Sequence, residues 1–398
     1  MAKDFLNKKY ILYGSSIIFV RTLEMLVLFF AAHYLDKENY GSLEYYKKVI
    51  EVGASFLSFG FPALILSYTR GENSKKYFYY LSLFFVLLLS FALFPILYHY
   101  RLQFLLIPLL FYAIFFTGGI TQSYLLVQWG SNKVSFYKML ISLGFYLLVA
   151  VQVYYYHVSA FAFVYPSYFL LPPMLIGVGY LYKQQKIVVR KLKQYGRLFY
   201  RLLASSFTLV VSNFANLMFL YTDIFIIKLL SDQANTDIAN YSFSLNIANA
   251  LMLIPFTLVQ VNIEKLKKSS SVIKKLNKKI TLLLILTALF LLVFYKLIVL
   301  YFLKKYAHTY ILFIIITVAK AFQAMSPLYG TYMVIKKRFR KNLWINLIML
   351  FLNFILSYVL YHKFRLYGVA VASALSLMVR YIILVRFVKR IENKNRHL

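Results

Sequence analysis

Cysteine is absent from this chain of 398 residues, and only 12 residues are acidic. The absence of cysteine excludes disulfide bonds, cysteine-ligated zinc and thiol catalysis. No glycine-rich phosphate-binding loop is present, which argues against ATP hydrolysis, and the spacing of the six histidines fits no zinc motif. We therefore expect no resident metal or organic cofactor.

Charged residues make up 14% of the chain and hydrophobic residues 62%, and the apolar residues form long blocks. A soluble domain of this size cannot hide so much apolar surface, whereas a block of about 20 residues spans a bilayer. The first block, from Tyr10 to Ala32, is too long for a cleaved signal peptide and no small-residue cleavage pattern follows it. The sequence therefore predicts an all-α polytopic membrane protein.

Twelve membrane spans are predicted, and the distribution of Lys and Arg orients them. With the N-terminus in the cytoplasm, 32 of the 45 Lys and Arg residues fall in inner segments and 10 at the outer side. This bias follows the positive-inside rule, so both termini are expected in the cytoplasm and the net charge of +33 needs no nucleic acid. The spans are 10–32, 45–68, 77–98, 103–127, 137–156, 159–181, 203–230, 238–261, 280–302, 308–334, 342–361 and 367–387.

The predicted spans divide into two halves of six. Residues 1–182 form the N-terminal lobe, residues 183–201 a basic cytoplasmic linker, and residues 202–398 the C-terminal lobe. Pro62 lies eight residues before Arg70, and Pro255 lies nine before Glu264, near the ends of spans 2 and 8. This recurrence favours two parallel repeats.

Several short motifs resemble a known family. They are "AHYLDKENYGSLEYY", "SFGFPALILSYTRG", "YTDIFIIKLLS" followed by "IANYSF", and "NLWINLIMLFLNFILSYVLYHKFRLYGVAVASALS" over residues 342–376. The chain resembles the polysaccharide (O-antigen, Wzx-type) flippases of the multidrug/oligosaccharidyl-lipid/polysaccharide (MOP) exporter superfamily. It departs from them at the second glycine of the last motif and in the proline common in the preceding turn.

The resemblance implies two six-helix lobes arranged as a V around a central cavity, with transport by alternating access. It implies a substrate class, oligosaccharides carried on polyprenyl pyrophosphate, and a bacterial cytoplasmic membrane location. A polysaccharide polymerase, other assembly proteins and membrane lipids are the expected partners.

Arg21 and Glu24 lie in the middle of the first span, three residues apart on one helical face. One interpretation is a pair that satisfies itself and aids packing. The other places both on a cavity wall, where the planar guanidinium can bind pyrophosphate through bidentate hydrogen bonds. Related lipid flippases also carry an arginine in span 1.

Span 2 opens with a charged stripe formed by Glu44, Lys47, Lys48 and Glu51. The stripe either lines the cavity, where the two lysines assist with phosphate or sugar, or belongs to a helix that projects above the bilayer. Lys320, near the middle of span 10, is the second-half cation expected at the substrate.

Asp223 is the only aspartate predicted at mid-membrane, and an intramembrane carboxylate is a functional candidate. It either couples transport to Na⁺ or H⁺, with help from Asn346 and Asn353 of span 11, or is a hydrogen-bonded packing residue. Arg380 lies about two turns from the cytoplasmic end and is expected to snorkel toward it.

The hypothesis that follows is a flippase, not an enzyme, that moves undecaprenyl-pyrophosphate-linked oligosaccharide units to the outer leaflet. A multidrug exporter is disfavoured because its cavity would be acidic. A lipid II flippase typically has two more spans, and a membrane enzyme of polysaccharide assembly would need a reactive cluster that the sequence lacks.

Overall fold

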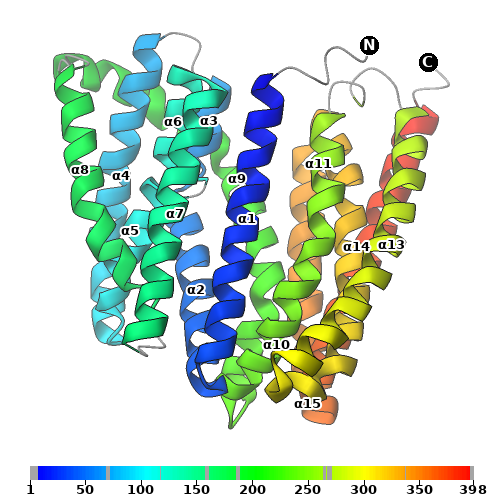
Figure 1. The fold of residues 1–398 in the computed structure, drawn as a ribbon. Helices are drawn as coiled ribbons and strands as arrows, with labels where there is room; N and C mark the ends of the chain where they lie inside the picture. Colours follow the sequence, from blue (N-terminus) through cyan, green and yellow to red (C-terminus); the bar gives the residue numbers. More distant parts are fainter. Residues whose placement is uncertain are drawn as a thin grey trace. The chain divides into compact units, whose positions relative to one another are not determined.

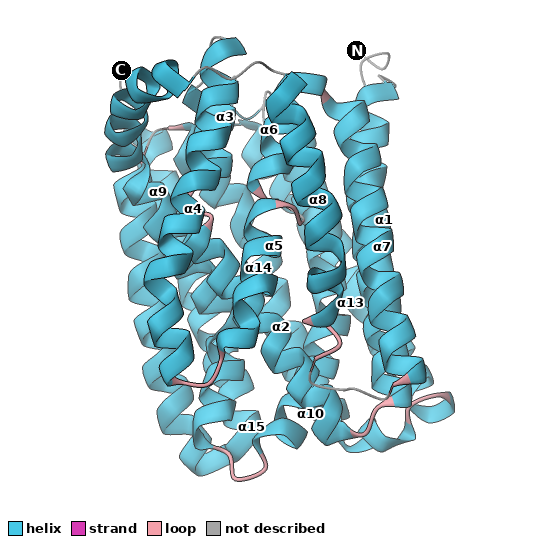
Figure 2. Cartoon of the chain, turned by 90° about the vertical axis from the view of Figure 1, so that its left-hand side faces the viewer, coloured by secondary structure: helices cyan, strands magenta, loops and turns pink. Residues whose placement is uncertain are grey.

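Helices are the only regular structure in the part of the chain that the structure describes (Figures 1 and 2). The computed structural model describes residues 8–68, 72–116, 118–156, 161–184, 189–262, 266, 271–336 and 338–394. Arg70 and Glu264 of the sequence motifs lie outside these residues. An all-helical fold satisfies the backbone hydrogen bonds within each segment, as lipid requires.

The chain forms two compact units, one of residues 1–35 and 46–210 and one of residues 36–45 and 211–398. The sequence predicted a boundary at a basic linker over residues 183–201, but from Val189 onward the chain is already part of a long helix. Lys, Arg, Leu and Gln, which dominate this stretch, are good helix formers, so a high density of charge does not interrupt the helix.

Among its described residues, the first unit contains eight helices in full and parts of two more. They are α1 (Lys8–Tyr34), α2 (Lys37–Leu57, from Tyr46), α3 (Phe61–Tyr68), α4 (Glu72–His99), η2 (Gln103–Leu105), α5 (Leu106–Ile114), α6 (Ile120–Trp129), α7 (Ser131–Tyr155), α8 (Tyr165–Gln184) and α9 (Val189–Leu230, to Val210).

The second unit begins with the first turns of α2 and the second half of α9. It continues with α10 (Ala234–Ala248), η3 (Asn249–Met252), α11 (Leu253–Val261), α13 (Ser271–Tyr301), η4 (Lys304–Thr309), α14 (Tyr310–Ile335) and α15 (Phe339–Lys394). The chain reverses within α15 at Arg365, whose φ of 51° and ψ of −131° are not helical. Predicted spans 11 and 12 are thus the two arms of α15.

Interrupted helices account for the predicted spans that are not single helices. Span 2 is α2 and α3, separated by a turn at residues 58–60, and span 8 is α10, η3 and α11. In both units the interruption directly precedes the proline, so that Pro62 and Pro255 lie in the first turn of α3 and α11, where a missing N–H is tolerated. The two prolines thus occupy similar positions in α3 and α11, and the two parallel repeats stay a prediction.

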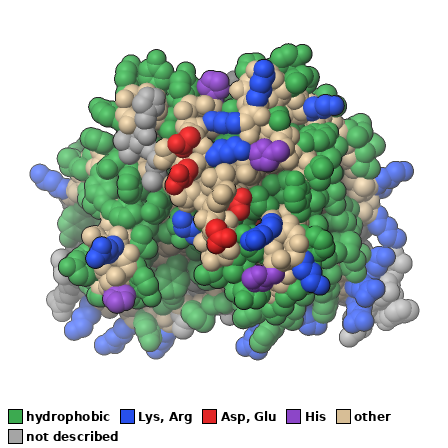
Figure 3. Space-filling model, turned by 90° about the horizontal axis from the view of Figure 1, so that it is seen from below, with side chains coloured by type: hydrophobic (Ala, Val, Ile, Leu, Met, Phe, Trp, Pro, Cys, Tyr) green, Lys and Arg blue, Asp and Glu red, His purple; other side chains and the backbone are tan. Residues whose placement is uncertain are grey.

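Seven helices of the described residues are long and apolar enough to cross a membrane by length and composition. Large hydrophobic side chains cover much of the surface, and the view in Figure 3 shows them around a group of charged and His side chains. Exposed apolar surface on this scale is typical of contact with lipid. The protein is therefore a multi-pass membrane protein.

Aromatic side chains fill the interior of each unit. In the first, Phe145 of α7 stacks on Phe111 of α5, with ring centroids 5.8 Å apart. In the second, Tyr295 stacks on Phe313 at 3.9 Å, and its hydroxyl lies 3.1 Å from the Ser244 Oγ. Buried tyrosines with a partner for the hydroxyl explain how the interior holds so many aromatic residues.

Candidate functional site

The middle of α1 and the middle of α2 carry the charged residues that the sequence singled out in the first unit. Arg21 Nη1 donates to Glu24 Oε2 at 2.8 Å, and Lys47 Nζ donates to Glu24 Oε1 at 2.6 Å. The second contact joins residues 23 positions apart, so it ties α2 to α1. The structure therefore brings Arg21, Glu24 and Lys47 together around one carboxylate.

Lys48 and Glu51 extend this cluster by one turn of α2. Lys48 Nζ donates to Glu51 Oε2 at 3.4 Å, and Lys47 Nζ lies 4.0 Å from Glu51 Oε1. Lys47 and Lys48 are both buried within the protein. We call Arg21, Glu24, Lys47, Lys48 and Glu51 the ion-pair cluster.

Exposure is uneven within the ion-pair cluster. The Arg21 side chain is 57% exposed, while those of Glu24 and Lys47 are 11% and 2% exposed. Three cations against two carboxylates leave the cluster with a net charge of +1. Its positive charge is thus presented at Arg21, over a buried carboxylate that holds the guanidinium in place.

Glu44 does not belong with the other charged residues of its helix. Its buried carboxylate accepts hydrogen bonds from Asn246 Nδ2 at 2.6 Å and Tyr40 at 3.1 Å, all within the second unit. The stripe read from the sequence is therefore divided between the two units. Gly41 makes the close approach possible, because a Cβ there would lie 1.7 Å from the Asn235 carbonyl oxygen.

Asp223 of α9 is the centre of a second buried cluster. Its carboxylate accepts hydrogen bonds from Ser373 Oγ at 2.6 and 2.7 Å, from Asn353 Nδ2 at 3.2 Å and from the Tyr241 hydroxyl. Among the described residues, no Lys or Arg nitrogen lies within ion-pair distance of it. We call Asp223, Tyr241, Asn353 and Ser373 the carboxylate cluster.

Asn346, predicted beside Asp223, bonds other residues. Its amide nitrogen donates to Ser212 Oγ at 3.2 Å, and its oxygen accepts from Arg380 Nη2 at 2.9 Å. Arg380 Nη2 also donates to Asn216 at 2.9 Å. The prediction that Arg380 snorkels is wrong, because two amide oxygens hold its guanidinium inside the unit.

Lys320 of α14 is buried, and its Nζ donates to Gln323 Oε1 at 2.8 Å, one turn along the same helix. The side chain is thus held by a neutral acceptor. The Lys320 ammonium also interacts electrostatically with Asp223 of the carboxylate cluster.

Sequence reasoning missed Lys138, Tyr241 and Ser373. Lys138 was counted among the Lys and Arg residues of the inner segments, yet α7 begins at Ser131, so Lys138 lies two turns inside the helix, buried and within electrostatic reach of Arg21. Tyr241 and Ser373 belong to the motifs "IANYSF" and "VASALS". These motifs were interpreted only as evidence of the family and not as candidate site residues.

The sequence of this chain matches a known protein family. The family described as "Polysaccharide biosynthesis protein" matches residues 6–263, well over half of the chain. The chain belongs to that family. No curated protein matches this member of the polysaccharide biosynthesis family.

Solved structures resemble this family member along nearly all of its length. A multidrug resistance MATE transporter of the MOP superfamily, in an inward-facing conformation, has a TM-score of 0.69 at 12% identity, with 94% of this chain and 96% of that one covered. The lipid II flippase MurJ, in an inward closed conformation, has a TM-score of 0.67 at 15% identity, with 95% and 87% covered. A MOP superfamily transporter from Pyrococcus furiosus has a TM-score of 0.56 at 13% identity, with 96% and 95% covered.

These likenesses establish the fold. The protein has the fold of the MOP exporters, and the family match confirms the resemblance drawn from its motifs. The family match ends at residue 263, before α13 begins. For the rest of the second unit the likeness rests on the solved structures.

Proposed function

We propose that this protein is a flippase that moves undecaprenyl-pyrophosphate-linked oligosaccharide units from the cytoplasmic to the outer leaflet by alternating access. Its family supports a role in polysaccharide synthesis, and the flippase activity named for MurJ supports a lipid-linked cargo. The proposal includes a bacterial cytoplasmic membrane with both termini inside, a polymerase and other assembly proteins as partners, and transport without catalysis.

The observation that carries the proposal is the exposed guanidinium of Arg21 above the buried carboxylate of Glu24. A pyrophosphate needs cationic donors, and a guanidinium offers two parallel N–H groups to its oxygens. Lys47, Lys48 and Lys320 are proposed to add positive charge near the phosphate or sugar, and Glu51 to hold the two lysines of α2. A drug-exporting site would present the opposite charge.

The two oxygens of Glu24 explain how Arg21 can change partners. Oε2 accepts from Arg21 and Oε1 from Lys47, so Glu24 keeps a buried cationic partner when Arg21 turns to a phosphate. An uncompensated buried carboxylate would be strongly destabilising. Glu24 thus positions Arg21 in the absence of cargo, and Lys47 stabilises Glu24 in its presence.

The carboxylate cluster is proposed to couple transport to Na⁺ or H⁺. Asp223 and Asn353 supply the oxygens that a Na⁺ ion prefers, and Tyr241 and Ser373 can rotate their hydroxyl hydrogens away from a bound cation. Protonation of Asp223 instead would remove one acceptor and require one donor to turn. Asn346, which the sequence analysis grouped with Asp223, would act by holding Arg380.

The proposal is tested by complementation of a polysaccharide-producing host from which its own flippase has been deleted. Arg21→Ala should reduce surface polysaccharide at least about tenfold, because one charge-assisted bidentate contact is lost. Arg21→Lys should retain part of the activity, since the charge remains but the planar fork does not. Protein level in the membrane is measured in parallel.

Arg340→Ala is the matched control, because Arg340 is an exposed arginine at the start of α15. It removes the same charge far along the chain from the ion-pair cluster and should leave surface polysaccharide unchanged. Full polysaccharide from Arg21→Ala would refute the role given to Arg21.

A further inference from the structure

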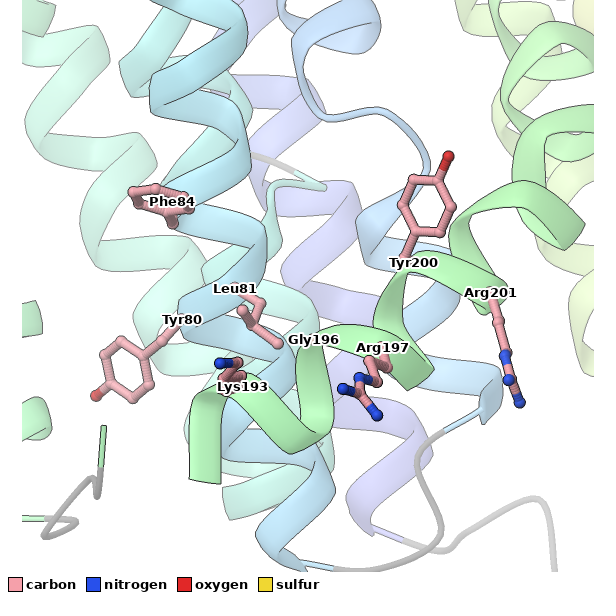
Figure 4. Close-up of a pocket in the computed structure, with 8 residues that line it drawn as sticks. All are labelled: Tyr80, Leu81, Phe84, Lys193, Gly196, Arg197, Tyr200 and Arg201. Atoms are coloured by element: carbon pink, nitrogen blue, oxygen red, sulfur yellow. The ribbon is translucent and has the colours of Figure 1, made fainter. Parts of the chain in front are cut away.

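A groove on the first unit is lined by residues other than those of the ion-pair cluster. It has a volume of about 820 Å³ and is formed by the start of α9 and the first half of α4 (Figure 4). Its lining residues are Tyr80, Leu81, Phe84, Lys193, Gly196, Arg197, Tyr200 and Arg201. None of them belongs to the ion-pair cluster.

The walls of the groove are fixed by aromatic packing. Tyr195 of α9 stacks on Tyr77 of α4, with ring centroids 4.8 Å apart and planes 9° apart, and Phe199 packs on Phe78 at 5.6 Å. Tyr77, Phe78 and Phe199 are buried. The two helices are therefore held together beneath the groove, and the site exists before any ligand arrives.

One wall of the groove is basic. Lys193, Arg197 and Arg201 follow each other at intervals of four residues, so they lie along one face of α9. All three are exposed, and no carboxylate of the described residues lies within ion-pair distance of them. The wall carries a charge of +3 that the described part of the protein leaves unbalanced.

The other wall is apolar and continues along α4. Phe84, Leu88 and Phe91 lie at intervals of four and three residues, on one helical face, and are 60%, 50% and 74% exposed. From Tyr80 to Phe91 this face extends about 16 Å at the 1.5 Å rise of a helix, close to the length of an acyl chain. Of the seven candidate spans, that of α4 is the least buried.

The basic and apolar ends of the groove are separated in space. In Figure 4, Arg197 and Arg201 extend toward one end of the view, while the rings of Tyr200 and Phe84 lie toward the other. A cationic end beside an aromatic and aliphatic strip matches a phosphate head group followed by its acyl chains.

We propose that this groove binds an anionic phospholipid of the surrounding bilayer. The head-group phosphate contacts Lys193, Arg197 and Arg201, and an acyl chain lies along Tyr80, Phe84 and Phe91. A zwitterionic lipid is disfavoured because its ammonium group would be placed among three cations. The lipid contacts α9 just before that helix passes from the first unit into the second at residues 210–211.

The test titrates the detergent-solubilised full chain with dioleoyl phosphatidylglycerol or dioleoyl phosphatidylcholine and counts bound lipids by native mass spectrometry. The wild type should retain phosphatidylglycerol in preference to phosphatidylcholine. The triple variant Lys193→Gln/Arg197→Gln/Arg201→Gln should weaken phosphatidylglycerol binding at least about tenfold, because each cation near a head group adds to its affinity. Equal retention of phosphatidylglycerol by this variant and the wild type would overturn the proposal.

The matched control removes three exposed lysines of α13, as Lys274→Gln/Lys275→Gln/Lys278→Gln. It has the same net charge as the groove variant and should bind phosphatidylglycerol as the wild type does. An equal loss in both variants would mean that only overall charge matters and would also overturn the proposal.

A second variant fills the groove without changing its charge. A Cβ at Gly196 would meet nothing within 4 Å, so Gly196→Leu can fold and occupy the groove with its side chain. Gly179→Leu, at an equally open position in α8, is its control. Only Gly196→Leu should lose bound phosphatidylglycerol, with the unfolding temperature of both variants unchanged or raised.

Undecaprenyl phosphate is the probe that separates a bilayer lipid from a lipid-linked cargo. Its binding should be the same in the wild type and the triple groove variant. If the triple variant loses undecaprenyl phosphate but keeps phosphatidylglycerol, the groove is a cargo site and the proposal fails. Lipid binding is measured without transport, so the result does not depend on the proposed function.

Discussion

The two units handle buried charge in different ways. In the first, cations and carboxylates pair directly, and Glu24 binds Arg21 and Lys47 at once. In the second, Asp223 is held by hydroxyl and amide donors and Arg380 by amide oxygens. Ion pairs can be exchanged for a charged cargo, whereas neutral donors let a single carboxylate gain or lose a small cation. The two units thus hold their buried charges with two different chemistries.

Glu24→Gln should produce the largest effect on stability. It leaves Lys47, which is 2% exposed, with a carboxylate only at 4.0 Å, and the loss of one partner of a buried pair costs about 3–5 kcal/mol. Thermal unfolding of the purified protein measures it. Glu24→Gln/Lys47→Met should recover most of the loss, and a double variant no more stable than Glu24→Gln would show that the pair is not the cause.

Gly41→Ala should produce the second largest loss of stability. It also tests the assignment of residues 36–45 to the second unit. The added methyl meets the backbone oxygen of Asn235, which cannot move aside, so overpacking of about 1–3 kcal/mol is expected in the unfolding free energy. Gly53→Ala on the same helix is the control, since its methyl would meet only the end of the Leu109 side chain. Equal losses at both positions would contradict the assignment of residues 36–45 to the second unit.

Asp223→Asn should have a smaller effect on stability and a specific one on coupling. The amide keeps one acceptor oxygen but sets its NH₂ against donors, which costs about 1–3 kcal/mol. Transport into proteoliposomes should then become independent of the Na⁺ or H⁺ gradient. An unchanged gradient dependence would remove Asp223 as the coupling residue, whatever the change in stability.

Arg21→Ala should change stability least. The Arg21 side chain is 57% exposed, and exposed ion pairs contribute about 0–1 kcal/mol. The same variant is expected to abolish most transport. Complementation should therefore fall without a matching loss of thermal stability for Arg21→Ala, whereas both should fall for Glu24→Gln. A large loss of stability in Arg21→Ala would mean that its pairing with Glu24 is structural.

The sequence predicted the fold more fully than the sites. Long apolar blocks form helices in lipid, so twelve spans could be placed from hydropathy. The breaks within spans 2 and 8 were not predicted, because Pro62 and Pro255 were interpreted only as a sign of repetition. The pair Arg21 and Glu24 followed from helical spacing alone. The pairing of Lys47 with Glu24 did not, because it joins two helices and depends on how α1 and α2 pack.

Burial within the bundle was the quantity least visible in the sequence. Lys138 was counted with an inner segment because hydropathy places a helix end only to within a few residues. Arg380 was expected to reach toward water because it lies about two turns from the predicted cytoplasmic end of span 12. Its amide partners, Asn216 and Asn346, are 164 and 34 residues away in the sequence. Contacts between residues that are far apart in the sequence produce no periodic pattern from which they could be predicted.

The reversal inside α15 has a consequence for how the chain is made. Arg365 turns the backbone, and Gly368 lets the second arm start against the first, since a Cβ there would lie 2.1 Å from the Leu360 carbonyl oxygen. So tight a hairpin leaves only a few polar residues, among them Lys363 and Arg365, between its two apolar arms. Its two arms can therefore leave the translocation channel as one closed hairpin, already packed before the rest of the unit gathers round them.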